Sequence, residues 1–347
     1  MKTGLFSRVV AAAVLAGSLA MPASAGADSL ESAFDRAYGS QARAPRDPAL
    51  QVPAFAAPQP LLRSFSSPFD AQIAQLANPA QGRIGVAAME LSTGRTVSVL
   101  GNQPFPLAST SKIAIVATYL EGVDQGRWRL SDAYPLMVPV ASAKFSSSVA
   151  PVRRGAMLSA QYLIERAIVH SDNQATDALL AAVGGPQAVN RWARKAGIAE
   201  FRIDRDIATL VRDDGAVNPA TTIDPRDAVT PLAMTRLLAG LYKGEWISPS
   251  SRAVLIGAME RCVTGKRRLR GQLPSEAWVA HKTGTLANTS SDVGIIRTPD
   301  GRAFAVAVYV TGQGGKAGRD AKIAELARTI YDGYLAEASF VRRTASR

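Results

Sequence analysis

The chain has very few of the residues that form cross-links or bind metals. Among its 347 residues there is one cysteine, Cys262, and there are two histidines, His170 and His281. A single cysteine excludes an intramolecular disulfide. The two histidines lie far apart in the sequence, and no thiolate pair accompanies them, so the spacing of a metal site is missing. The sequence therefore predicts no resident metal and no cofactor.

Long hydrophobic runs are also scarce, apart from one short run near the start. Lys2 and Arg8 are followed by an apolar segment over residues 9–21, and Ala23-Ser24-Ala25 has the small residues of a cleavage site. The run is too short for a typical membrane span. We expect a signal peptide over residues 1–25 and a periplasmic or secreted protein without a membrane span after cleavage. The alternative is a retained membrane anchor.

Negative charge is in short supply as well. Forty Lys and Arg residues against 28 Asp and Glu residues give a formal net charge of +12. Such a surface suits nucleic acid, an acidic envelope or anionic substrates. The chain has no zinc-finger spacing, no aromatic-and-basic motif and no long Lys/Arg block, so we expect no nucleic-acid partner. Nothing in the sequence requires a protein partner either, and we expect a monomer.

Composition divides the chain into segments. Residues 26–66 are rich in proline and alanine and lack periodicity, which is typical of a flexible leader. Residues 67–337 show the alternation of apolar and polar residues expected of a globular domain. Residues 338–347 form a basic C-terminal tail.

The order of predicted elements indicates the fold class. Strand-like segments lie near both ends of the domain, at 83–90, 95–100, 292–296 and 302–310. Helical periodicity occupies the middle and the C-terminus, at 69–76, 113–120, 178–183, 187–196, 233–242 and 321–335. This order predicts an α+β fold in which N- and C-terminal strands form one antiparallel sheet packed with helices, and an all-helical subdomain is inserted between them.

Three short motifs carry the chemistry: Ser109-Thr110-Ser111-Lys112, Ser171-Asp172-Asn173 and Lys282-Thr283-Gly284. A serine hydroxyl is a weak nucleophile that needs a base, and residues three apart on a helix share a face, so the amine of Lys112 is placed to reach Ser109. Each motif alone has an ordinary explanation as a helix cap, a turn or a strand. Their number and order together predict acyl transfer through a serine ester.

With these motifs, the chain from about Phe69 to Leu335 resembles the class A β-lactamases, within the penicillin-recognising serine hydrolases. The resemblance extends to Thr230-Pro231-Leu232-Ala233-Met234 and to the hairpin around Pro299-Asp300-Gly301-Arg302. Arg205 and Asp227 resemble the ion pair that pins the family's Ω-loop. The resemblance implies the β-lactamase/transpeptidase-like fold, and a β-lactam or D-alanyl peptide as the small-molecule substrate.

The resemblance also implies a role for each site residue. Ser109 would form the acyl-enzyme. Lys112 would help to deprotonate the Ser109 hydroxyl, and Ser171 would pass a proton to the leaving nitrogen. Lys282 would complete the catalytic set by supplying positive charge. Substrate binding would fall to Asn173, Thr283, Gly284, Thr285 and Arg268, with the N–H groups of Ser109 and Thr285 as oxyanion hole.

One of these assignments, and one further candidate residue, has a competing interpretation. Arg268 either assists the substrate carboxylate or is a solvated member of the basic run Lys266-Arg267-Arg268. Phe145 either walls the site or is an ordinary aromatic residue. For Gly284, the absence of a side chain is expected to let the substrate backbone approach closely.

The chain departs from the resemblance at one position. Where class A enzymes carry the glutamate that activates the hydrolytic water, this chain has Ile207. Asp206, Asp213 or Asp214 would replace it if the loop folds differently, or they are solvated loop residues. Without a base, hydrolysis of the ester slows by ~10²–10⁴-fold. The sequence therefore predicts a serine β-lactamase, with two alternatives: a D,D-peptidase or esterase of the same fold, or a slowly deacylating penicillin-binding sensor.

Overall fold

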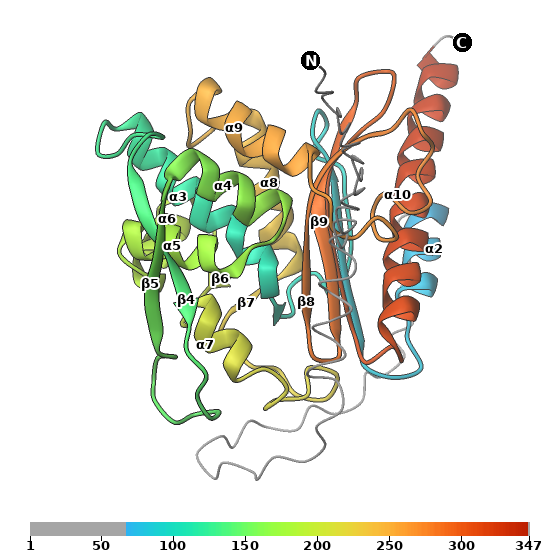
Figure 1. The fold of residues 1–347 in the computed structure, drawn as a ribbon. Coiled ribbons are helices and arrows are strands. Elements are labelled where there is room, and N and C mark those ends of the chain that lie inside the picture. Colours follow the sequence, from blue (N-terminus) through green and yellow to red (C-terminus); the bar gives the residue numbers. More distant parts are fainter. Residues whose placement is uncertain (1–66, 346–347) are drawn as a thin grey trace, which may run out of the picture.

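The computed structural model describes residues 67–345, with side chains to residue 337. The predicted signal peptide and leader therefore lie outside the described residues, as does the end of the basic tail. Five antiparallel strands form the main sheet, in the spatial order β2 (Thr96–Val99), β1 (Arg83–Glu90), β10 (Ala303–Thr311), β9 (Thr289–Arg297) and β8 (Trp278–Leu286). The N- and C-terminal strands are thus neighbours, which confirms the predicted sheet (Figure 1).

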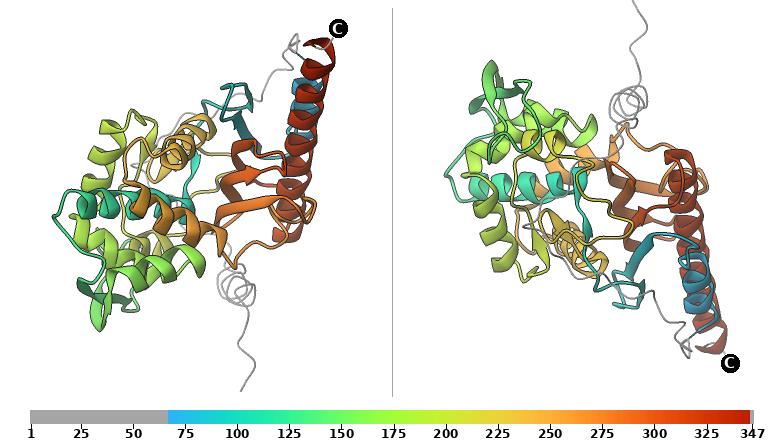
Figure 2. Two further views of the ribbon diagram at one scale, coloured as in Figure 1. Left: turned by 90° about the horizontal axis from the view of Figure 1, so that it is seen from above. Right: turned by 90° about the horizontal axis from the view of Figure 1, so that it is seen from below.

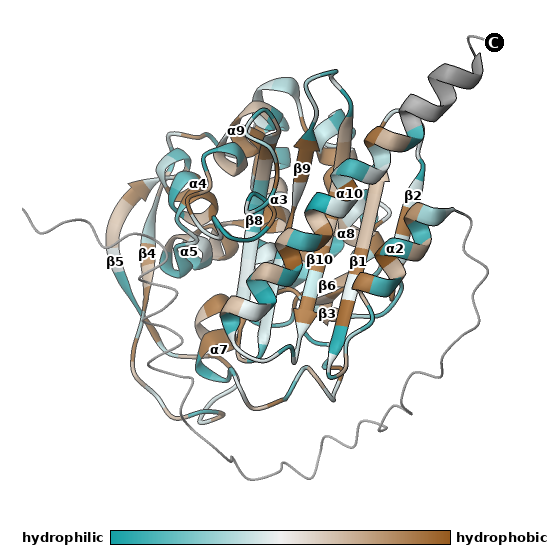
Figure 3. Cartoon of the chain, turned by 90° about the vertical axis from the view of Figure 1, so that its right-hand side faces the viewer, coloured by the Kyte–Doolittle hydropathy of each residue, from teal (hydrophilic) through white to brown (hydrophobic). Residues whose placement is uncertain are grey.

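The central strand β10 is apolar along nearly its whole length because both faces of the sheet are covered. Every residue of β10 is buried, and its three valines pair in register with the apolar residues Ala88, Val86 and Ile84 of β1. Helices α2 (Pro68–Leu76) and α10 (Lys316–Ala345) lie on one face, and the remaining helices lie on the other (Figures 1 and 2). The alternation of polar and apolar residues along α10 is seen in Figure 3.

The larger apolar core lies between the other face of the sheet and the helices that cover that face. Its centre is α3 (Lys112–Asp124), most of whose residues are buried. The surrounding helices are α4 (Ala160–Val169), α5 (Asn173–Val183), α6 (Pro186–Lys195), α7 (Ile207–Arg212), α8 (Pro231–Lys243) and α9 (Pro249–Glu260). In the described residues, no helix is long and apolar enough to cross a membrane.

The prediction of an all-helical insertion needs a correction. Strands β4 (Ala133–Pro139) and β5 (Val152–Ser159) form an antiparallel hairpin within it, and β3 (Phe105–Pro106), β7 (Ala228–Val229) and β6 (Phe201–Arg202) form a small three-stranded sheet. The hairpin escaped prediction because no residue of β5 is buried and β5 lacks apolar alternation, while β4 contains Pro135 and ends at Pro139. The small sheet has strands too short to produce a periodicity.

Candidate active site

The first motif lies where the chain leaves β3 and turns into the core. Ala108 to Ser111 form a 3₁₀ turn, η1, and Lys112 is the first residue of α3. Ala108 has a φ of 47°, a left-handed conformation that is unfavourable for a residue with a side chain and is typical of constrained functional turns. Ser109 therefore stands at the start of a helix, as predicted, although in a 3₁₀ turn.

The second motif joins α4 to α5. Ser171 also adopts a left-handed conformation, with a φ of 59°. Asp172 caps α5 by accepting the N–H of Ala175 at 2.9 Å. Its carboxylate also accepts the guanidinium Nε–H of Arg166, on α4, at 2.9 Å. Burial opposes ionisation of Asp172, but these hydrogen bonds and the charge of Arg166 hold its pKa below the ordinary value. The capped turn fixes Ser171 and Asn173 on either side of Asp172.

Two lysines converge on this turn. Lys112 Nζ donates to the carbonyl of Ser171 at 2.6 Å and to Asn173 Oδ1 at 2.8 Å, and it lies 3.3 Å from Ser171 Oγ. Lys282, on β8, donates from Nζ to the same hydroxyl at 2.9 Å. Both lysines are fully buried. Burial, and then the charge of Lys282, lower the pKa of Lys112 well below 10.5, so this amine is suited to accepting a proton.

Ser109 lines a cleft of about 620 Å³ together with Ser171, Asn173, Thr283 and Thr285. This volume lies in the range of small-molecule sites. Among the described residues, no hydrogen bond is made by the Ser109 hydroxyl, so the expected contact with Lys112 is not formed here. Catalytic hydrogen bonds commonly tighten only when substrate is bound. The cleft thus brings all three motifs to one place.

Gly284 has a packing function in this arrangement. A Cβ at this position would lie 3.0 Å from Ala108 Cβ, 3.0 Å from the carbonyl of Leu107 and 2.5 Å from Ser291 Oγ. The glycine therefore lets β8, the edge strand of the sheet, approach the Ser109 turn. Gly284 is not among the cleft-lining residues. Its expected contact with the substrate remains a prediction.

Arg268 is not a solvated member of a basic run, so that interpretation is wrong. Its side chain is fully buried, and Nε donates to Asp320 Oδ1 at 2.7 Å. Nη1 donates to the carbonyls of Gly284 and Ser291 at 3.0 Å each, and Nη2 donates to Thr285 Oγ1 at 2.8 Å. Arg268 does not line the cleft. Arg268 therefore reaches the cleft lining only through its hydrogen bond to the hydroxyl of Thr285, and its role in substrate binding stays a prediction.

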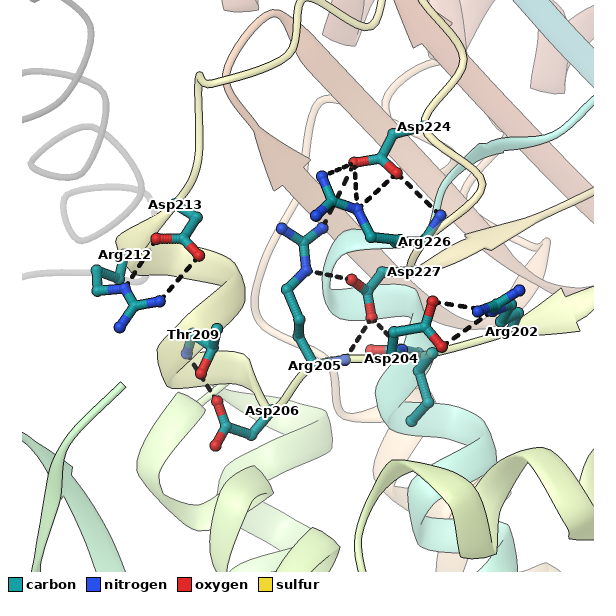
Figure 4. A network of polar contacts seen from close by, with 12 residues as sticks. Arg202, Asp204, Arg205, Asp206, Thr209, Arg212, Asp213, Asp224, Arg226 and Asp227 are labelled. Carbon is teal, nitrogen blue, oxygen red and sulfur yellow. Dashed lines mark hydrogen bonds and ion pairs between the residues drawn. The ribbon is translucent and has the colours of Figure 1, made fainter. Parts of the chain in front are cut away.

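The segment from Arg205 to Asp227, here called the Ω-loop, closes the cleft on the other side. Arg205 Nε lies 2.5 Å from Asp227 Oδ2, and Asp227 Oδ1 accepts the N–H groups of Asp204 at 2.8 Å and Arg205 at 3.1 Å. Figure 4 shows this network at the point where the two ends of the loop meet. The predicted ion pair is therefore present.

The comparisons with known proteins agree with this geometry. The model of the beta-lactamase enzyme family matches residues 68–334. The chain belongs to this family. It is 32% identical over 266 residues to beta-lactamase CTX-M-25 of Escherichia coli, covering 76% of this chain and 88% of that protein. It is 29% identical over 265 residues to an imipenem-hydrolyzing beta-lactamase of Enterobacter cloacae, covering 75% and 88%.

Solved structures lead to the same family. An ancestral class A beta-lactamase matches with a TM-score of 0.67 and 34% identity, covering 76% of this chain and 99% of that one. A beta-lactamase from Chitinophaga pinensis matches with a TM-score of 0.67 and 28% identity, covering 77% and 99%. The fold is therefore that of the class A beta-lactamases.

This beta-lactamase family member has an apolar Ω-loop wall. Ile207, Leu210 and Val211 line the cleft. The three aspartates proposed as replacement bases do not line it, and each has a structural partner. Asp206 caps α7 through the N–H of Thr209 at 2.7 Å, Asp213 pairs with Arg212 and accepts the N–H of Phe145 at 3.1 Å, and Asp214 accepts the N–H of Ala287 at 2.9 Å. In this geometry, none of the three lines the cleft as a replacement base.

Phe145 belongs to the loop of the β4–β5 hairpin. Its side chain is 54% exposed, its φ is 57°, and it does not line the cleft. The interpretation of Phe145 as a wall of the site is therefore not supported. The aromatic residue that does line the beta-lactamase cleft is Tyr162, from α4.

Asp177 is a residue beside the site that the sequence did not single out. It lies on α5, is almost fully buried, and accepts the N–H groups of Ile207 at 2.7 Å and Ala208 at 2.9 Å. Burial, reinforced by the charge of Asp206, raises its pKa to about 7. The signal was an aspartate four residues after Asn173, directly before the apolar run at 178–183. Because both N–H groups belong to the start of α7, Asp177 fixes Ile207 in the cleft wall.

Proposed function

We propose that this protein is a serine β-lactamase that opens the β-lactam amide through an ester on Ser109. The observation that carries the proposal is the convergence of two buried lysines on the Ser171 hydroxyl, in the cleft that Ser109 lines. Membership of the beta-lactamase enzyme family supports the same conclusion.

Ester formation needs a base, an electrophile and a proton for the leaving group. With its lowered pKa, Lys112 takes the proton of Ser109 as the oxygen attacks the lactam carbonyl carbon. The N–H groups of Ser109 and Thr285 stabilise the oxyanion, and the C–N bond breaks. Ser171, held between both lysines, passes a proton to the departing nitrogen. Lys282 keeps the region positive, which favours an anionic substrate.

Substrate binding uses the remaining polar groups of the cleft. Asn173 binds the amide of the acyl side chain, and Thr283 and Thr285 bind the carboxylate of the substrate. Arg268 positions Thr285 from behind. The apolar side of the acyl group packs on Ile207, Leu210 and Val211, which line the opposite wall.

Hydrolysis of the ester is the slow half of the proposed reaction. Ile207 supplies no proton acceptor where a water would be activated, so deacylation falls by about 10²–10⁴-fold relative to a site with a positioned base. This observation favours a second candidate function: a penicillin-binding protein that is acylated and released slowly, or a D,D-peptidase or esterase whose acyl group leaves room for water.

We further propose that the protein acts in the periplasm or outside the cell. This proposal rests on the signal-like residues 1–25, with the leader over 26–66 and the tail over 338–347 flanking the domain over 67–337. In this proposal, the protein needs no cofactor and acts as a monomer on a small molecule.

Time-resolved mass spectrometry of the intact mature protein with nitrocefin, followed alongside product absorbance, tests the proposal. A transient adduct on Ser109 with continuous product release supports a β-lactamase. A persistent adduct supports the slowly deacylating alternative. No adduct and no product with nitrocefin or benzylpenicillin would reject both and leave the peptidase or esterase, to be tested with D-alanyl peptides and simple esters.

A further inference from the structure

Two threonine hydroxyls of the cleft are each held by a buried group behind them. Thr285 Oγ1 lies 2.8 Å from Arg268 Nη2. A guanidinium has only donors, so Thr285 must accept this hydrogen bond. The proton of the Thr285 hydroxyl is therefore directed to another acceptor, such as a substrate carboxylate. The direction of the hydrogen bond between Arg268 and Thr285 is therefore fixed, because only Arg268 can donate it.

The second hydroxyl has a different partner. Thr283 Oγ1 lies 2.6 Å from Thr264 Oγ1, and either atom is able to donate. Both threonines are almost fully buried, yet both line the cleft. The orientation of Thr283 is constrained because its methyl group packs against Gly265, where an added Cβ would lie 2.3 Å from Thr283 Cγ2. Its hydroxyl therefore remains next to Thr264.

The thiol of Cys262, which lies behind Thr264, decides the direction in which these hydrogen bonds are donated. Cys262 Sγ lies 3.2 Å from Thr264 Oγ1, whereas the carbonyl of Thr264 is 4.0 Å away. Thr283 has one proton, so donating it to an anion requires Thr283 to accept from Thr264. Thr264 then has no proton left for the sulfur and accepts from the thiol. The complete chain runs from Cys262 S–H to Thr264, to Thr283 and then to the anion.

We infer that Thr264 is a specificity-determining residue for the substrate carboxylate and that the Cys262 thiol positions it. This inference rests on the proposed function, because it requires the cleft to bind an anionic β-lactam. Arg268 and Cys262 then serve the two threonines in parallel, one through a donor that cannot be reversed and the other through a weak donor that can.

Acylation kinetics with two matched substrates test the inference. The substrates are a chromogenic cephalosporin with its free carboxylate and the methyl ester of the same compound, which lacks the anion. We expect Thr264→Val to raise the half-saturating concentration for the acid by about 3- to 10-fold, the effect of one hydrogen bond, and to leave that for the ester unchanged. Cys262→Ala should produce a smaller effect of the same kind, about 2-fold, and Cys262→Ser should restore the wild-type value.

Thr289→Val is the matched control. Thr289 is fully buried at the start of β9, and among the described residues its hydroxyl has no hydrogen-bond partner. The control makes the same atomic change outside the chain of hydroxyls, so the ratio between acid and ester should stay at the wild-type value.

An equal effect of Thr264→Val on both substrates, or no effect on either, would overturn the inference. If Thr264→Val does not fold, the two Cys262 variants carry the test, since Cys262→Ala removes only the sulfur and Cys262→Ser restores a hydrogen-bond donor at that place. Failure of the wild-type protein to form an adduct with either compound would instead reject the proposed function.

Discussion

On one side of the cleft, two fully buried lysines share the hydroxyl of Ser171, whereas on the other side the Ω-loop presents Ile207, Leu210 and Val211. The first region consists of ionisable and hydroxyl groups joined by hydrogen bonds. The second has none facing the cleft, although its segment is rich in aspartates. Here Asp206, Asp213 and Asp227 bind backbone N–H groups or arginines of their own region (Figure 4).

The difference between the two regions separates the two halves of the reaction. In the proposed reaction, forming the ester requires the lysines and Ser171, which meet in one hydrogen-bonded group. Cleaving the ester requires a base beside a water molecule, whereas the Ω-loop presents hydrocarbon side chains to the cleft. Both regions are held firmly by buried hydrogen bonds, so the apolar wall is a stable feature and not a loosely folded substitute. Changes in each region should therefore affect different steps.

The largest effect is expected in the polar region. Ser109→Ala removes the nucleophile, and we expect the rate of adduct formation with nitrocefin to fall at least ~10³-fold. The melting temperature should stay unchanged, because the hydroxyl makes no hydrogen bond to the described residues. Intact-mass kinetics and thermal denaturation provide the two measurements. Wild-type activity in a folded Ser109→Ala protein would place the nucleophile elsewhere.

The converse change restores a base to the apolar wall. Ile207→Glu keeps the N–H that binds Asp177 and adds a carboxyl at the cleft surface. Burial and the neighbouring Asp177 should raise the pKa of the new glutamate towards the working pH, which suits a general base. We expect the acyl-enzyme of Ile207→Glu to hydrolyse about 10²–10⁴-fold faster, measured from the lifetime of the adduct.

Ile207→Gln is the control for this change. It has the same size and polarity but no carboxylate, and its adduct should live as long as that of the wild type. If the glutamate variant forms the ester normally and releases it no faster, position 207 does not face the hydrolytic water. The separation of the two halves of the reaction would then have another cause.

The sequence predicts the polar region better than the apolar one. Motif order placed Ser109, Ser171 and Lys282 together, and the sheet followed from apolar runs at both ends of the domain. Such features are visible because they depend on spacing and periodicity. The partners of Asp206, Asp213 and Asp214 depend on how the Ω-loop folds, and no local pattern specifies that.

The burial of Arg268 was likewise not predictable from the local sequence. In the sequence it belongs to a run of three basic residues, which ordinarily indicates a solvated surface. Its burial depends on Asp320, which is 52 positions away on α10, and on carbonyls of two strands. Long-range compensation of a buried charge is a property of the tertiary structure, so only the fold distinguishes Arg268 from its neighbours.

The anchor of the apolar wall should be the main stability determinant of the Ω-loop. Asp227→Ala removes three hydrogen bonds and leaves Arg205, whose side chain is only 15% exposed, without its closest partner. We expect the free energy of unfolding to fall by about 3–5 kcal/mol, measured by denaturant unfolding. Asp332→Ala on α10 breaks an exposed pair with Arg328 and should leave the midpoint unchanged. Equal losses of unfolding free energy in Asp227→Ala and Asp332→Ala would show that burial does not distinguish the two ion pairs.

A pH-dependent effect is expected for Asp177, which connects the two regions. Its pKa is raised to about 7, from an ordinary value of 3.8, first by burial and then by Asp206. Between pH 4 and 7 the folded state therefore holds a proton that the unfolded state has released. This contribution to stability is complete below about pH 4 and is lost as the pH rises through 7. The expected slope is at most about 1.4 kcal/mol per pH unit.

Asp177→Asn should remove this slope while one oxygen still accepts an N–H at the start of α7. Unfolding at several pH values between 4 and 8 measures it, and parallel curves for the two proteins would contradict the assignment. The charge of Asp177 also opposes the lowering of the pKa of Lys112. As Asp177 ionises, the amine holds its proton more tightly, so the pH dependence of ester formation should shift to lower pH in Asp177→Asn. A residue that only supported the apolar wall would leave that profile in place.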